Sequence, residues 1–263
     1  MSPASSATAQ IESAFIPDAR TWERWTASGA GLEMDYGVWN RFLGRYLTTA
    51  RDGGTRVDYA AVTSADRSAL TRFVNGLEAA KPTAMTRAQQ KAYWINLYNA
   101  ATIELVLKHY PVSTIRKIHG GLLRTGPWRK DVLTVDGVEM SLSDIEHRIL
   151  RPIFNDPRGH YALNCASVGC PDLAKTAYDP AKLDAQLDAA ARAFINHPRA
   201  FRVEKDGDLT VSSIFGWYRD DFGGKAGVFR HAAPFAAPKL RAVLQGRTDW
   251  DDTDYDWDLN DAE

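Results

Sequence analysis

The sequence predicts an α+β fold in a single domain, with a central helix packed on a small antiparallel sheet. Helical segments and hairpins are interleaved without the repeating strand–helix–strand order of a doubly wound sheet. The longest helical segment is apolar on nearly all sides, which is typical of a buried helix. With 263 residues, 44% of them hydrophobic and 25% charged, the chain can bury a sizeable core. We expect residues 1–30 to be a loosely ordered leader and residues 31–263 to form the domain.

The helices are predicted from apolar side chains that recur at helical spacing. After a short turn near Trp22, the first regular helix begins at Tyr36 and ends at the break Asp52-Gly-Gly54. The longest helix runs over Thr86–Tyr110 and is ended by Pro111. Four other helices are predicted at 65–79, 143–150, 180–196 and 213–222.

Two Asp-Gly pairs predict tight hairpin turns. Residues alternate in polarity around Asp136-Gly137 in Val132–Met140, and Phe201–Val211 shows the same pattern around Asp206-Gly207. Short extended segments are also predicted at 57–59 and 161–163.

The segment 160–171, His-Tyr-Ala-Leu-Asn-Cys-Ala-Ser-Val-Gly-Cys-Pro, contains both cysteines of the chain and a histidine. A cysteine nucleophile or a metal bound by cysteine must therefore lie in this segment. Cys165 follows the predicted strand 161–163, and strand ends commonly present reactive side chains. A cysteine whose proton a histidine accepts is a nucleophile for acyl groups or similar electrophiles. The sharpest hypothesis is that Cys165 is such a nucleophile.

Two histidines are candidates to activate Cys165. Along an extended strand of about 3.3 Å per residue, His160 lies roughly 16 Å from Cys165, and it points to the opposite face. Direct pairing within one straight strand is therefore excluded, whereas His147 on a separate helix is free to approach. We predict a Cys165–His147 pair, and we expect His160 to support the site; a sharp bend after Leu163 would overturn this elimination.

Glu146 is the third predicted catalytic residue, because its position beside His147 suggests an orienting acid. Adjacent residues on a helix point about 100° apart, however, and do not readily meet. A capping box between Ser143 and Glu146 is therefore the favoured interpretation of this carboxylate.

Three polar residues of the central helix, Asn96, Asn99 and Glu104, are predicted to support the site. Each could orient His147, and each could supply a donor for an oxyanion hole; the sequence does not choose among them. The alternative for the two amides is structural, since a buried amide needs partners and often ties down a loop.

The two cysteines allow three other interpretations. Cys165 and Cys170 can form a structural disulfide, which their spacing permits. They can also ligate zinc together with His160 or His147, although H-x4-C-x4-C is not a common zinc pattern. Finally, Cys165 can be buried and inert. No metal or other cofactor is predicted.

The acidic tail 249–263 is predicted to dock on the domain. Tyr255, Trp257 and Leu259 alternate toward the protein, and the intervening aspartates face water. A calcium loop is disfavoured, because Trp257 occupies the position where such a loop needs glycine.

The composition of the chain excludes some classes of binding partner. The net charge of −1 argues against broad nucleic-acid binding, and no apolar run is long enough to span a bilayer. We expect a small-molecule or peptide substrate. The compartment stays open: periplasm or cell envelope if a signal peptide has been removed, and otherwise the cytoplasm. The sequence does not give the oligomeric state.

Several long motifs occur together in this chain: Lys91–Ala100, Asp144–Arg151, His160–Pro171, Ser213–Tyr218 and Tyr255–Asn260. In this order they resemble the domain-of-unknown-function 547 family, over about residues 36–260. Bacterial members of that family often resemble secreted or lipid-anchored proteins, and plant members carry an added coiled coil. The resemblance implies a fold and a site but no reaction.

Two functions follow as hypotheses. The first is a cysteine-dependent hydrolase or acyl transferase that acts on a peptide-like or small thiol-containing substrate, in an arrangement comparable by analogy with papain or transglutaminase. The second is a non-catalytic binding domain of the cell envelope, with a structural disulfide or metal at the Cys165/Cys170 loop.

Overall fold

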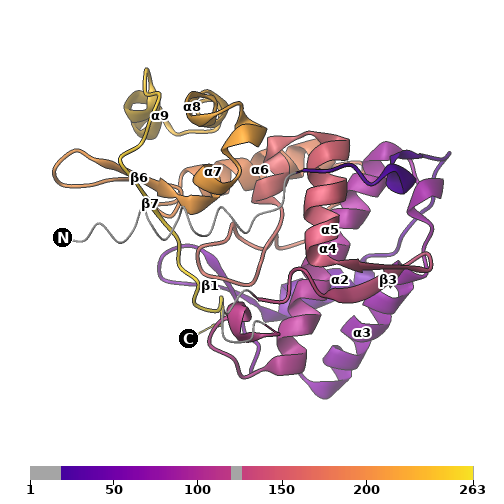
Figure 1. The fold of residues 1–263 in the computed structure, drawn as a ribbon. Coiled ribbons are helices and arrows are strands. Elements are labelled where there is room, and N and C mark those ends of the chain that lie inside the picture. The colour runs from indigo at the N-terminus through magenta and orange to yellow at the C-terminus, as the bar shows by residue number, and fades with distance from the viewer. Residues whose placement is uncertain (1–18, 120–125, 263) are drawn as a thin grey trace.

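A computed structural model describes residues 19–119 and 126–262 (Figure 1). In this part of the chain the helical elements are η1 (Glu23–Thr26), α2 (Gly37–Tyr46), α3 (Ser64–Glu78), η2 (Pro82–Ala84), α4 (Arg87–His109), η3 (Ile115–Lys117), α5 (Leu142–Asp144), the π-helix η5 (Ile145–Phe154), η6 (Pro157–Tyr161), α6 (Leu183–Ile195), α7 (Ser213–Trp217), η7 (Arg219–Phe222), α8 (Lys225–Ala232) and α9 (Pro238–Leu244). The strands are β1 (Leu47–Thr49), β2 (Thr55–Val57), β3 (Asp131–Val135), β4 (Val138–Ser141), β5 (Phe201–Val203), β6 (Leu209–Ser212) and β7 (Asp252–Asp254).

These elements confirm the α+β class. The described strands form three small sheets with the orders β1-β2, β3-β4 and β5-β6-β7. Both predicted hairpins are present, as the antiparallel pairs β3-β4 and β5-β6. The pairing of β6 with β7 is parallel, so the third sheet is mixed.

Helix α4 is the central element, as its apolar surface predicts. A capping box between Thr86 and Gln89 begins it, and residues 90–107 are all buried. Its packing differs from the expectation, because α4 contacts α3 and the π-helix η5 instead of lying on one antiparallel sheet. The cause is the length of the strands: sheets of three to five residues per strand are too small to cover a helix that is apolar on all sides.

Buried side chains form two hydrophobic clusters. The first surrounds α4 and contains side chains of α2, α3, β3, β4 and η5. The second contains side chains of α6, β5, β6, α7 and α8. Of these elements, β6, α7 and α8 are labelled at the upper left of Figure 1. Tyr161, at the end of η6, belongs to the second cluster, whereas Ala162 and Leu163 belong to the first. The segment with the cysteines therefore begins where the two clusters meet.

The predicted helix 143–150 begins earlier and continues differently. Its capping box joins Ser141 and Asp144, with reciprocal hydrogen bonds of 3.1 and 3.0 Å, so the predicted box between Ser143 and Glu146 is wrong. From Ile145 the helix is a π-helix, a rare form that is frequent at functional sites. Glu146 is left free for other contacts.

The predicted strand 161–163 is absent. The chain forms η6 instead, which begins after the N-cap Asp156. Asn99 then accepts a hydrogen bond from the backbone of Asn164 and donates one to the carbonyl of Ala162, at 2.9 Å each. These bonds hold the backbone away from an extended course, and Ala166 follows with a positive φ of 62°. The sharp bend that would overturn the elimination of His160 is present.

The beginning and the end of the described chain are both packed on the protein. Of the expected leader, residues 1–18 lie outside the described residues, and Trp25 is buried with its ring centroid 5.3 Å from that of Trp94. The backbone N–H groups of Arg20 and Trp22 donate to carbonyls of the π-helix. In the tail, Leu259 is buried and the flanking aspartates are more exposed, as the alternating pattern predicts.

Candidate functional site

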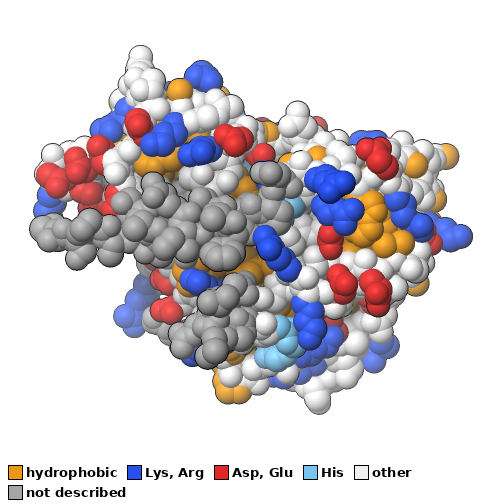
Figure 2. Space-filling view, in the orientation of Figure 1, with side chains coloured by type: hydrophobic (Ala, Val, Ile, Leu, Met, Phe, Trp, Pro, Cys, Tyr) orange, Lys and Arg blue, Asp and Glu red, His pale blue; other side chains and the backbone are white. Residues whose placement is uncertain are grey.

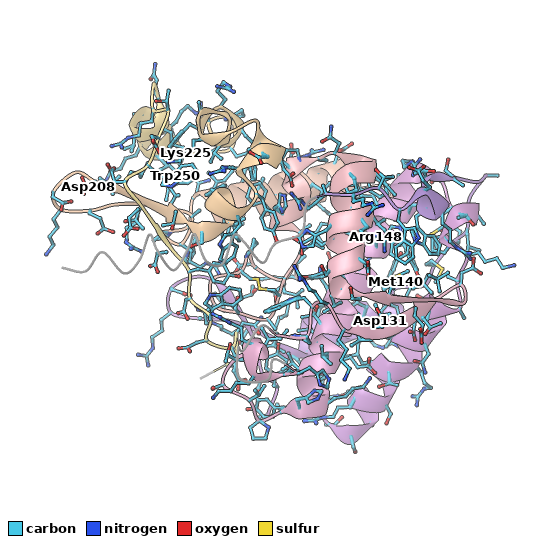
Figure 3. The ribbon with its side chains drawn as sticks, in the orientation of Figure 1. Asp131, Met140, Arg148, Asp208, Lys225 and Trp250 are labelled. Carbon is cyan, nitrogen blue, oxygen red and sulfur yellow. A yellow bond between two sulfur atoms is a disulfide. The ribbon has the colours of Figure 1, made fainter. Side chains whose placement is uncertain are left out.

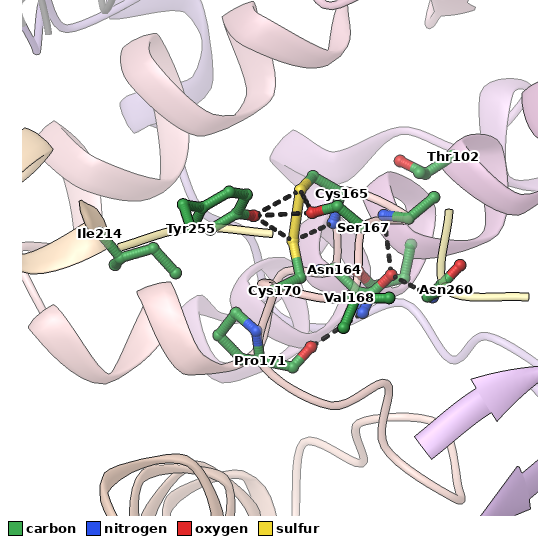
Figure 4. The surroundings of a disulfide bond; sticks show 12 residues. Thr102, Asn164, Cys165, Ser167, Val168, Cys170, Pro171, Ile214, Tyr255 and Asn260 are labelled. Carbon is green, nitrogen blue, oxygen red and sulfur yellow. Dashed lines mark hydrogen bonds between the residues drawn. A yellow bond between two sulfur atoms is a disulfide. The ribbon is translucent and has the colours of Figure 1, made fainter. Parts of the chain in front are cut away.

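The structure joins Cys165 and Cys170 in a disulfide, so the described chain contains no free cysteine (Figure 4). The Cys170 residue is only 3% exposed, whereas Cys165 is partly accessible. A thiolate is the nucleophilic form of cysteine. In this state neither sulfur can therefore serve as the predicted nucleophile.

Hydroxyl groups surround the disulfide. The Tyr255 hydroxyl lies 3.1 Å from both sulfur atoms, and Ser167 Oγ lies 3.1 Å from Cys165 Sγ and 2.8 Å from the Tyr255 hydroxyl. The backbone N–H of Cys165 donates to Cys170 Sγ at 2.9 Å. Figure 4 shows Tyr255 pointing at the bond from a segment far along the chain. Among the described residues, no histidine contacts either sulfur atom.

The disulfide loop also holds the C-terminal tail. Backbone N–H groups of Val168 and Gly169 donate to the backbone carbonyls of Asp258 and Asp256, at 2.8 Å each, and Ser167 forms an isolated β-bridge with Leu259. Below the loop, the buried Asn164 side chain accepts a hydrogen bond from Asn260 and donates one to Pro171. The loop is thus a connection between α4, through Asn99, and the tail.

A second polar site lies at the π-helix, in a small cleft that is partly open to solvent and has a volume of about 20 Å³. The cleft lies where η5, η6, η7 and α4 come together. Six charged or titratable side chains line it: Lys91, Glu146, Arg151, Asp156, His160 and Asp221. Buried charges cost free energy unless they are paired, and clusters of titratable side chains in clefts are frequent at functional sites. The cleft is therefore a candidate functional site.

Asp221 is the centre of a chain of ionic contacts. Arg151 binds both of its oxygens, at 2.6 and 2.9 Å, and His160 Nε2 lies 2.7 Å from Oδ2. Burial alone raises the pKa of Asp221, but the hydrogen bonds from His160 and Arg151 outweigh it and hold the pKa well below its usual range. Asp221 is therefore an anion that orients the His160 ring, which stacks on Tyr218 at 4.2 Å.

His147 contacts Arg151, one of the residues bound to Asp221, and it does not contact Cys165. Its Nδ1 is 2.9 Å from a guanidinium nitrogen of Arg151, and its ring is stacked 6.0 Å from that of Tyr218. Burial lowers the pKa of His147, and the nearby charge of Arg151 lowers it further against the attraction of Glu146. The predicted pairing of His147 with Cys165 has no contact to support it among the described residues.

Glu146 is held by two tyrosines. The Tyr98 hydroxyl donates to its Oε2 at 3.5 Å, and the Tyr218 hydroxyl also hydrogen-bonds to it. Burial raises the pKa of both tyrosines well above the usual value, and the carboxylate raises it further. Both hydroxyls therefore keep their protons and act as donors. Glu146 has no ion pair among the described residues.

Lys91 closes the other side of the cleft. Its Nζ binds Asp156 Oδ2 at 2.5 Å, and Arg158 binds the same carboxylate through Nε and Nη2 at 2.8 to 3.2 Å. Burial alone raises the pKa of Asp156, but the bonds from Arg158 and Lys91 outweigh it and lower the pKa well below its usual range. Arg158 in turn binds Asp184 and Asp188 on α6.

The remaining predicted residues serve the fold. Asn96 exchanges two hydrogen bonds with the backbone of Tyr178, at 2.8 and 2.9 Å, which is the structural alternative for this amide. Glu104 accepts a bond from Thr71 at 2.7 Å and pairs with Lys108, so it connects α3 to α4. Neither lines the cleft or contacts the disulfide.

The sequence interpretation missed Lys91, Arg151, Asp156 and Asp221 as residues of the cleft. The Arg151 side chain is only 10% exposed. Asp156-Pro157 before a helix start is a capping signal that could have drawn attention to Asp156. Asp221 had no local signal, because its partners lie 61 and 70 residues away.

Away from the cleft, charges of both signs are interspersed over the face shown in Figure 2. Figure 3 shows Lys225 beside Trp250, where Nζ lies 4.9 Å from the ring centroid and fastens the segment before β7 to α8. Within the described residues, no helix is long and apolar enough to cross a bilayer. The same residues contain no cluster of three His, Cys, Asp or Glu side chains that could hold a metal.

Residues 82–195 match the model of the family described as protein of unknown function, DUF547. The resemblance to that family is confirmed over this segment. It spans α4, the π-helix and both cysteines, and it ends before Asp221 and Tyr255. No curated protein and no solved structure matches the chain. The comparison with papain or transglutaminase therefore stays an analogy.

Proposed function

We propose that this chain is a non-catalytic binding domain of an oxidising compartment such as the cell envelope, and that the Cys165–Cys170 disulfide stabilises its fold. The observation that carries the proposal is the disulfide itself, with a buried Cys170 and a tail fastened to its loop. Structural disulfides persist in secreted and periplasmic proteins and are rare in the cytosol.

The surroundings of the bond support a structural role. Catalytic disulfides need an accessible sulfur and an electropositive environment that lowers a thiol pKa. Here the neighbours of both sulfur atoms are the hydroxyls of Tyr255 and Ser167 and a backbone N–H. The guanidinium that contacts the loop, that of Arg199, donates to the carbonyls of Val168 and Cys170 and is paired with Asp172, and it has no hydrogen bond to either sulfur atom.

The test is the redox state of the native protein. We expect intact mass after iodoacetamide treatment to show no added label until the protein is unfolded and reduced, when two labels appear. Peptide mapping then assigns them to Cys165 and Cys170. A native protein that takes up label without reductant would overturn the proposal.

A second candidate function, the cysteine-dependent hydrolase or acyl transferase, is favoured by one observation. Once the bond is reduced, Ser167 and Tyr255 would place two hydroxyl donors at Cys165 Sγ, where they could stabilise a thiolate. Its substrate would be peptide-like or a small thiol-containing molecule. The test is the pH dependence of Cys165 alkylation in the reduced protein: a midpoint well below about 8.5 supports this candidate, and an ordinary midpoint contradicts it.

A further inference from the structure

A cavity of about 330 Å³ lies between the beginning of α2, the beginning of α4 and the segment before α6. Its lining consists of residues 32–37, Asn40, Gln89 and residues 177–180, and it shares none of them with the disulfide loop or with the cleft at the π-helix. Small-molecule pockets of proteins have volumes of about 300–1,000 Å³. The cavity is therefore large enough for a small ligand, and it is partly open to solvent.

Hydrogen bonds between distant segments hold the walls of this cavity in place. Asn40 Oδ1 accepts from the backbone N–H of Ala177 at 2.7 Å, which joins α2 to the segment before α6. The Gln89 side chain accepts from the backbone N–H of Leu32 at 3.1 Å and donates to Glu33 Oε1 at 3.0 Å. The cavity is therefore formed before any ligand enters, as is usual for ligand sites.

The charged side chains of the cavity are all acidic. Glu33, Asp35 and Asp179 line it, and none of the described Lys, Arg or His residues does. Each of the three carboxylates accepts one hydrogen bond from an amide of the protein. Within the described residues their only ion pair joins Asp179 to the exposed Lys182, at 3.8 Å. A carboxylate has about four acceptor sites, so each keeps free capacity for a positively charged donor.

Tyr36 shows that two of these carboxylates act on the same part of the cavity. The pKa of Tyr36 is raised to about 12: burial raises it most, a hydrogen bond from Asn96 lowers it, and the charges of Glu33 and Asp179 raise it again. Glu33 and Asp179 are far apart in sequence, yet both are close enough to act on this one hydroxyl. A cation near Tyr36 would therefore be attracted by both carboxylates.

Tyr178 supplies a buried hydroxyl that has no partner. The residue lines the cavity and is 2% exposed, and among the described residues its hydroxyl has no hydrogen bond. Only its backbone is bonded, by the Asn96 side chain. Burial raises the pKa of Tyr178, so the hydroxyl keeps its proton. A buried polar group without a partner costs free energy, which favours a ligand that hydrogen-bonds to this hydroxyl.

The arrangement of the carboxylates selects an organic cation over a metal ion. The described residues contain no group of three His, Cys, Asp or Glu side chains that could hold a metal. An ammonium group has three donors for carboxylate and hydroxyl oxygens, and Leu32, Met34 and Pro180 offer apolar surface for a carbon chain. We propose that this cavity binds a small protonated aliphatic amine, whose ammonium group the carboxylates attract. The inference names a ligand class for the proposed binding domain and rests on that proposal.

The test is isothermal titration calorimetry of the full chain at pH 7 and low ionic strength, because salt screens charges in a partly open cavity. The probes are 1,4-diaminobutane and 1,4-butanediol, which have the same carbon chain with and without positive charge. We expect the diamine to bind and the diol to bind at least about tenfold more weakly. Absence of diamine binding at millimolar concentrations, or equal binding of the diol, would overturn the proposal. Calcium chloride that binds more tightly than the diamine would also overturn it, because the cavity would then be a metal site.

Variants locate the bound amine. The double variant Glu33→Gln/Asp179→Asn removes two charges with little change of shape, and we expect it to weaken diamine binding by about tenfold or more. Glu139→Gln, an exposed change on β4, should leave binding unchanged. A double variant that is folded by circular dichroism and binds the diamine like the wild type would overturn the proposal.

A single removed hydroxyl provides an independent check. Tyr178→Phe is expected to weaken diamine binding without lowering the Tm, because the hydroxyl has no partner in the protein to lose. Unchanged diamine binding in this variant would contradict the contact with Tyr178. Free native thiols would refute the proposed disulfide but leave the cavity standing, whereas an intact disulfide without diamine binding would refute only the cavity.

Discussion

Removal of the Cys165–Cys170 bond should weaken the protein by a calculable amount. The two cysteines are five residues apart, and the loop-entropy model for so short a loop gives about 2 kcal/mol. For a protein of this size about 1 kcal/mol corresponds to roughly 2–4 °C in Tm. The double variant Cys165→Ala/Cys170→Ala is therefore expected to melt about 4–8 °C below the wild type in differential scanning calorimetry.

A reductant provides the matched control. It should lower the Tm of the wild type toward that of the double variant and leave the variant unchanged. Hydrogen exchange should in addition rise at Val168 and Gly169, whose N–H groups bond to the tail. A double variant with the Tm of the wild type would refute the structural role of the disulfide, because the bond would then not restrict the unfolded chain.

Three further predictions concern the packing and the ionic chain. Asn99→Ala leaves the carbonyl of Ala162 and the N–H of Asn164 without their partner, and should lower the free energy of unfolding in urea by about 2–4 kcal/mol, whereas exposed Asn75→Ala should change it little. Trp25→Ala should cost about 3–5 kcal/mol in the same assay. The pKa of Asp221 is lower in the folded protein than its unfolded value of about 3.9, so ionised Asp221 stabilises the folded state above that pH. This stabilisation is lost as the pH falls, so Asp221→Asn should flatten the decline of stability from pH 5 to pH 2.

Each of these predictions has an outcome that contradicts it. Equal effects at positions 99 and 75 would mean that the Asn99 bonds are not formed in solution. A Trp25→Ala variant as stable as the wild type would mean that residues 19–30 are not packed on the domain. An unchanged acid profile in Asp221→Asn would mean that this carboxylate is not paired in the folded state.

Local patterns were sufficient for the regular elements. Helix α4 is predictable because a long apolar surface and the terminal Pro111 indicate a buried helix without knowledge of its neighbours. The turns at Asp136 and Gly137 are predictable because both residues need a positive φ. The strand at 161–163 failed because three apolar residues carry no period, and distant Asn99 decides their conformation.

The candidate site was only partly predictable for the same reason. Glu146, His160 and both cysteines stand in recognisable motifs, so the sequence could nominate them. Which of them meet depends on contacts between residues far apart in sequence, such as Asp221 with Arg151. The elimination of His160 assumed a straight strand, and the π-helix that turns Glu146 toward Tyr98 has no signature in the residue order.

The extent of the matched family segment has a practical consequence for anyone who wishes to work with a shorter protein. Residues 82–195 contain the cysteines, Lys91 and Glu146, yet Asp221 on η7 and Tyr255 in the tail lie beyond its end, and Trp25 lies before its start. A fragment trimmed to those limits would lose one wall of the cleft, the hydroxyl over the disulfide and the aromatic cover of α4. The smallest unit that keeps both sites intact runs at least from Arg20 to Asn260.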